Sequence, residues 1–114
     1  MELVCRDTGE MRLIKVAEDR IDAAVAIQFK DLVREMTEDG PMRVVLDFSR
    51  VTFLDSSGLG AVVAAMKQVG EGRKLELAGL TPNVEKVFRL TRMDTVFTIH
   101  PDIDALGLGL RHAG

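Results

Sequence analysis

Two adjacent serines stand between an acid and a glycine, at a point where a buried strand is expected to lead into a helix. The residues are Asp55, Ser56, Ser57 and Gly58, and a second glycine follows at Gly60. Unpaired backbone N–H groups and the positive end of the helix dipole would lie beside them, which suits a phosphate group. Nothing nearby supplies the base that activates an enzyme's hydroxyl nucleophile. The segment therefore indicates a place for a phosphate rather than a catalytic centre.

A simple helix cap is the plainest alternative, because Asp, Ser and Gly are common where a strand turns into a helix. Composition alone favours that alternative. Against it, two hydroxyls follow the acid where one would suffice. Gly58 and Gly60 also fall in the expected first turn, although a glycine inside a helix costs about 1 kcal/mol relative to alanine. Small residues at this place predict the close approach of another molecule.

Enzyme and metal sites are not indicated. A hydrolase elbow needs a glycine two positions before its serine, and neither Ser56 nor Ser57 has one. The two histidines, His100 and His112, lie late in the chain, and His100 is expected in a loop or cap. The segment 58–60 lacks the Lys-Ser/Thr ending of a phosphate-binding loop. We expect no catalytic residue, no cofactor and no metal.

The elements that must position the serines follow from hydrophobic spacing. Short apolar runs predict strands at 3–6, 11–16, 43–48, 75–78 and 96–99. Helical spacing and capping signals predict four helices, with Asp22 as the cap of the first and with starts near 59, 81 and 101 for the others. Strands that alternate with helices favour an α/β fold with a largely parallel sheet, to which the N-terminal hairpin adds an antiparallel pair.

Bulk properties narrow the class of protein. The 114 residues fit one domain spanning 1–114, and the formal net charge of −3 comes from interspersed acids and bases. A basic face, as a nucleic-acid partner would require, is not expected. No signal peptide is apparent, and the apolar run at 59–66 is too short to cross a bilayer. With a single cysteine, Cys5, expected as an apolar filler in a strand, the sequence predicts a soluble, cytoplasmic protein without a membrane partner.

The run from Val44 to Gly60, VVLDFSRVTFLDSSGLG, resembles the signature of the STAS domain. More narrowly, it is similar to bacterial anti-sigma factor antagonists. The resemblance extends over nearly the whole chain, since further matching segments fall in order at 21–22, 75–77, 81–82 and 88–91. It implies a mixed sheet of about five strands backed by helices, and it implies no catalytic activity.

The resemblance also implies a partner and a switch. Such antagonists bind an anti-sigma factor that is also a serine kinase, are phosphorylated by it and then released, and are reset by a serine phosphatase. The phosphorylated residue would be Ser57, the second hydroxyl after the acid, with Ser56 as the helix cap. The implied partner-binding residues are Asp22, Asp55, Ser56, Ser57, Gly58 and Leu59.

One position departs from the family's pattern. Asp19 stands where the family usually has a glycine, so the turn before Asp22 is expected to be reshaped.

Two other functions stay open. The chain could serve as a non-phosphorylated STAS scaffold subunit of a transporter or signalling complex, or it could sense a nucleotide or lipid in a cleft between sheet and helices, although no residue specifies such a ligand.

Overall fold

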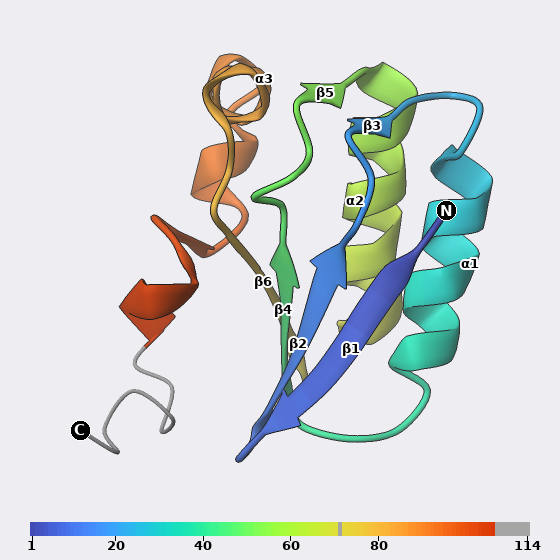
Figure 1. Ribbon diagram of the computed structural model, residues 1–114, viewed down its shortest axis with the longest axis vertical. Helices are drawn as coiled ribbons and strands as arrows, with labels where there is room; N and C mark the ends of the chain where they lie inside the picture. Colours follow the sequence, from blue (N-terminus) through green and yellow to red (C-terminus); the bar gives the residue numbers. More distant parts are fainter. Residues whose placement is uncertain (71, 107–114) are drawn as a thin grey trace.

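A five-stranded mixed sheet supports the helices in the computed structural model, which describes residues 1–70 and 72–106 (Figure 1). Within these residues the α-helices are α1 (Ala26–Met36), α2 (Ser56–Val69) and α3 (Pro82–Leu90). The strands are β1 (Leu3–Thr8), β2 (Met11–Val16), β3 (Arg20–Ile21), β4 (Arg43–Asp47), β5 (Phe53–Leu54), β6 (Lys74–Ala78) and β7 (Ile99–His100). Two 3-10 turns, η1 (Met93–Thr95) and η2 (Ile103–Leu106), complete the order.

The main sheet has the strand order β1-β2-β4-β6-β7. Its first two strands form the predicted antiparallel hairpin, and the remaining neighbours are parallel. Figure 1 shows α1 and α2 side by side over one face of this sheet. The predicted α/β fold with a mixed five-stranded sheet is therefore confirmed.

The core lies between the sheet and these two helices. Alternation along β2 sends Ile14 and Val16 into it, because successive side chains of a strand point to opposite faces. The ring of Phe29, on the apolar stripe of α1, meets Phe48 edge to face with 6.4 Å between ring centroids. Further fully buried members come from α1, β4 and α2, namely Val33, Val44, Leu46, Val62 and Ala65.

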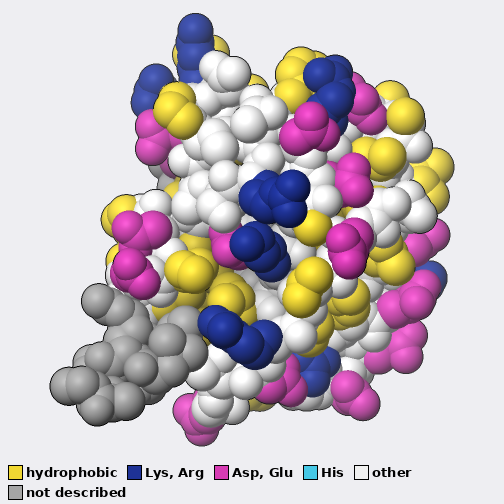
Figure 2. All heavy atoms as spheres, viewed as in Figure 1, with side chains coloured by type: hydrophobic (Ala, Val, Ile, Leu, Met, Phe, Trp, Pro, Cys, Tyr) yellow, Lys and Arg dark blue, Asp and Glu magenta, His cyan; other side chains and the backbone are white. Residues whose placement is uncertain are grey.

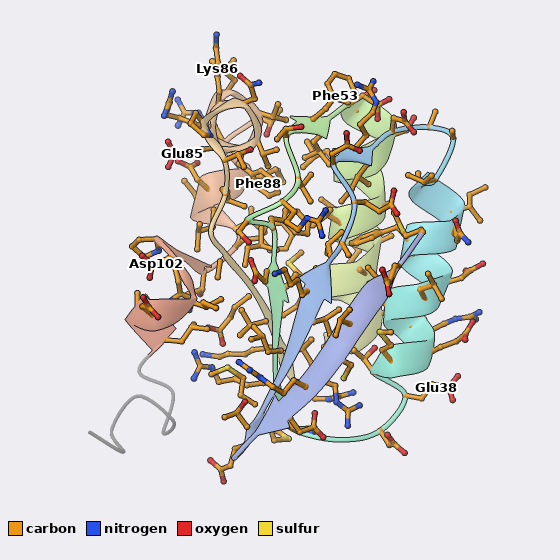
Figure 3. The ribbon with its side chains drawn as sticks, in the orientation of Figure 1. Glu38, Phe53, Glu85, Lys86, Phe88 and Asp102 are labelled. Atoms are coloured by element: carbon orange, nitrogen blue, oxygen red, sulfur yellow. The ribbon has the colours of Figure 1, made fainter. Side chains whose placement is uncertain are left out.

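The C-terminal region differs from the prediction. The strand expected at 96–99 is the two-residue β7, because residues 93–95 form η1 and Phe97 turns inward to pack on Phe88 with 5.7 Å between ring centroids. Figure 3 shows Phe88 pointing inward from α3, whereas Lys86 points away from the protein. The expected fourth helix is only η2, whose i, i+3 pair Ile103 and Leu106 lies against the second face of the sheet. The residues beyond 106, including His112, lie outside the described residues.

A second, two-stranded parallel sheet of β3 and β5 was not predicted. Figure 1 shows the two strands beside the start of α2. The backbone carbonyl of Asp19 accepts hydrogen bonds from the N–H groups of Thr52 and Phe53, at 2.8 and 3.1 Å. Among the described residues other than glycine, only Arg92 has a positive φ. Asp19 therefore fits the turn without a left-handed backbone conformation.

Glu76 forms a buried ionic cluster on the second face of the sheet. Its carboxylate lies 2.7 Å from Arg43 Nε and 2.7 Å from His100 Nε2. The hydrogen bond from Arg43 lowers the pKa of Glu76, burial opposes this shift, and the contact with His100 adds to it. His100 thus lies in a strand and makes a specific contact, which corrects the expectation of a loop or cap. Cys5 lies in β1 as expected, but it is exposed rather than a core filler.

Candidate functional site at the start of α2

Asp55 joins the beginning of α2 to the turn at residues 22–25. It is the N-cap residue, and its Oδ1 accepts a hydrogen bond from the backbone N–H of Gly58 at 2.8 Å. Its Oδ2 accepts a second from the N–H of Ala23 at 3.2 Å. One carboxylate therefore satisfies an N–H group of the helix and also fixes the neighbouring segment against it.

The cap prediction for Ser56 is wrong, because Asp55 occupies the cap position. An extended backbone at Asp55, with φ −96° and ψ −175°, lets the short carboxylate reach the third helical residue. Ser56 and Ser57 are then the first two residues of the helix, and both are exposed. Their hydroxyl groups make no hydrogen bond to any residue that the structure describes. Two hydroxyls are thus available to a partner.

Asp22 does not cap α1. Val25 holds that position without a side-chain hydrogen bond, because a further turn separates Asp22 from the helix. Instead, Asp22 Oδ1 accepts from the N–H of Ala24 at 3.1 Å, and Oδ2 lies 3.5 Å from Arg20 Nε. The Arg20 guanidinium also covers the ring of Phe53, 4.1 Å from its centroid, and Figure 3 places Phe53 beside the start of α2. Asp22 therefore lies next to Ala23, whose N–H binds Asp55, and its charge is partly balanced by Arg20.

The glycines of the first turn have different roles. A Cβ on Gly58 would lie 2.0 Å from the carbonyl oxygen of Ile21, so Gly58 is required by packing within the chain rather than by an approaching molecule. A Cβ on Gly60 would meet nothing within 4 Å, which leaves open space there. Between them, Leu59 is half-buried and packs on the core.

The open space at Gly60 belongs to a hollow of about 190 Å³ between α1 and α2. Its lining residues are Ala26, Ile27, Lys30, Ser57, Gly60, Ala61 and Ala64. Ile27 is 71% exposed at its edge. This hollow was not predicted from the sequence. The available signal was the run of small residues on α2 at 57, 60, 61 and 64, whose i, i+3, i+4, i+7 spacing marks one helical face.

The surface shows no dominant charge on the face seen in Figure 2, where Lys and Arg side chains are distributed among Asp and Glu side chains. In residues 1–70 and 72–106, no three His, Cys, Asp or Glu side chains lie close enough together to hold a metal ion. No helix within the same ranges has the length and apolar composition needed to cross a bilayer.

Comparison with known proteins identifies the family. The STAS domain family matches residues 5–106. BtrV of Bordetella bronchiseptica, provisionally named an anti-sigma factor antagonist, is 28% identical over 102 residues, which are 89% of this chain and 88% of BtrV. An anti-sigma-B factor antagonist of Listeria monocytogenes is 27% identical over 100 residues, covering 87% of this chain and 86% of the relative.

A solved structure agrees with these relatives. The crystal structure of an anti-sigma factor antagonist from Mycobacterium paratuberculosis superposes with a TM-score of 0.81 at 25% identity, covering 93% of this chain and 91% of that one. The chain belongs to the STAS domain family, and its relatives include anti-sigma factor antagonists. These antagonists are not enzymes, so the prediction of a non-enzymatic protein is confirmed.

Proposed function

We propose that the protein is an anti-sigma factor antagonist that binds an anti-sigma serine kinase and is released when the kinase phosphorylates Ser57. A serine phosphatase would return it to the binding state. The observation that carries this proposal is the state of Ser57 itself. Its hydroxyl is exposed in the first turn of α2 and has no hydrogen-bond partner among the described residues. A kinase can reach such a hydroxyl without unfolding the helix.

The start of α2 can accept a phosphate with little change of fold. In a helix the first N–H groups have no intrahelical partner. Among those of α2, the Asp55 side chain accepts a hydrogen bond only from the N–H of Gly58. The N–H groups at Ser56 and Ser57 and the helix dipole therefore favour an added anion. The phosphate would change the partner interface instead, because it brings roughly two negative charges and three acceptor oxygens to an exposed position.

The partner surface is proposed to centre on the two serines and to include Asp22 and Leu59 at its edge, while the buried Gly58 would hold the helix start in place. Asp55 would act by holding the helix start in place, since both of its carboxylate oxygens accept hydrogen bonds from backbone N–H groups. Asp22 keeps a negative charge near the serines, although Arg20 balances part of it. A phosphate on Ser57 would add to this negative charge on the face that the kinase has to cover.

Incubation with ATP and the candidate serine kinases of the source genome tests the proposal. Mass spectrometry should find one phosphate, on Ser57, in the wild-type protein and in Ser56→Ala, and none in Ser57→Ala. The Ser57→Ala variant should keep its affinity for the kinase. A chain that accepts no phosphate from any of these kinases would contradict the switch and favour the non-phosphorylated scaffold subunit.

A further inference from the structure

Lys30 and Ser57 both line the hollow between α1 and α2. They are the two polar side chains among the residues that line it, since the remaining lining residues are glycine, alanine and isoleucine. The neighbouring cations are occupied, because Arg20 lies 3.5 Å from Asp22 and Arg34 lies 3.8 Å from Asp31. Lys30 makes no ion pair with any residue in the described part of the chain. An unpaired cation and an unbound hydroxyl thus share one otherwise apolar hollow.

We propose that Lys30 is the counter-ion of phosphorylated Ser57, an inference that rests on the proposed function. The lysine's methylene chain would lie along the alanine floor of the hollow while its ammonium group meets the phosphate oxygens. A cavity needs about 10–15 Å³ to admit one water, and the hollow of about 190 Å³ has room for both charged groups with water around them. Apolar walls screen the pair less than open solvent does, which strengthens the attraction.

Phosphorylation would then act on the partner surface in two ways. It adds negative charge at Ser57, and it draws Lys30 over the hollow. In the unmodified protein the hollow is open beside the exposed Ile27 and offers a partner an apolar recess with a nearby cation. In the phosphorylated protein both the recess and the cation would be engaged within the chain. Lys30 is therefore assigned a positioning role in the switch, not a catalytic one.

The test uses full-length protein with phosphoserine incorporated at position 57 during synthesis, so that no kinase is needed. The 31P resonance is followed against pH in wild type, Lys30→Gln, Lys30→Arg and the control Lys67→Gln. Lys67 is an exposed lysine in the last turn of α2, about 15 Å along the helix from Ser57.

The second ionisation of a phosphoserine ordinarily has a midpoint near pH 6, and a nearby cation lowers it. We expect Lys30→Gln to raise the midpoint by about 0.5 pH units at low salt, with a smaller difference at high salt. Lys30→Arg should restore the wild-type midpoint, and Lys67→Gln should leave it unchanged. Equal midpoints in wild type and Lys30→Gln would overturn the assignment.

This result is separable from the fate of the proposed function. If no kinase modifies Ser57, the switch proposal fails, yet the titration still measures whether Lys30 meets a phosphate placed there. If wild type and Lys30→Gln have the same midpoint while a kinase phosphorylates Ser57 and then releases the protein, the switch stands and the role of Lys30 is refuted.

Discussion

The starts of α2 and α3 place similar hydroxyls in different situations. Thr81, the N-cap residue of α3, donates its hydroxyl to the carbonyl oxygen of Val51 at 2.6 Å and thus ties the helix to a loop. At α2 the carboxylate of Asp55 makes the capping and tying contacts, and Ser57 is left exposed without a partner in the described chain. One hydroxyl stabilises the fold, and the other is available for chemistry because an acid has taken over its structural role.

The tightest part of the α2 start is Gly58, and enlarging it should have the largest effect. In Gly58→Ala the new Cβ would lie 2.0 Å from the Ile21 carbonyl oxygen. Backbone must move to relieve this overlap, so we expect the free energy of unfolding to fall by about 3 kcal/mol. Gly60→Ala is the matched control. Nothing lies within 4 Å of its Cβ, and a gain of up to about 1 kcal/mol is expected from helix propensity. Urea unfolding measures both, and similar losses in the two variants would contradict the assignment.

Asp55 makes the capping contacts at the start of α2 in place of a serine hydroxyl. Its removal tests this division of roles directly. Asp55→Ala removes the acceptor of the Gly58 and Ala23 N–H groups, and we expect a loss of about 2 kcal/mol in the free energy of unfolding. Ser56→Ala should change it by less than about 0.5 kcal/mol, because its hydroxyl is exposed and unbound. Thermal and urea unfolding of the two variants provide the measurement. A larger loss in Ser56→Ala would restore Ser56 as the cap.

The hydroxyls of Thr81 and Ser57 are expected to give the smallest difference in the free energy of unfolding. Thr81→Val keeps the shape of the side chain but leaves the Val51 carbonyl without its donor, so a loss of about 1 kcal/mol is expected. Ser57→Ala should lie within about 0.5 kcal/mol of wild type. Urea denaturation midpoints with unchanged slopes are sufficient to detect the difference. Equal effects of the two substitutions would mean that Ser57 also serves the fold.

The fold could be predicted because its main elements are long enough to show a hydrophobic period. Alternation along β2 and the apolar stripe of α1 both appear in the sequence, and each faces the core as expected. The pair β3 and β5 could not be predicted, since two residues show no period. Residues 96–98 were wrongly assigned to a strand, because the burial of Phe97 against Phe88 is a tertiary contact that local preference does not report.

The sequence predicts which residues form the candidate site, which stays a prediction, but not the contacts that hold them in place. The Asp-Ser-Ser-Gly run predicts a site at the start of α2, yet several caps compete in such a run, and only the backbone geometry at Asp55 decides between them. The requirement for Gly58 depends on Ile21, a residue far away in the sequence. The hollow depends on how α1 and α2 pack, so the presence of Lys30 in the same hollow as Ser57 could not be derived from the helix stripe of α1 alone.

The most direct test of the switch at Ser57 is calorimetric titration of the kinase that modifies the chain with two forms of the protein, one unmodified and one carrying phosphoserine at position 57. The phosphorylated form should bind at least about 100-fold more weakly, a difference of about 2.8 kcal/mol. Equal dissociation constants for the two forms would contradict the claim that the charge on this one hydroxyl decides whether the partners stay together.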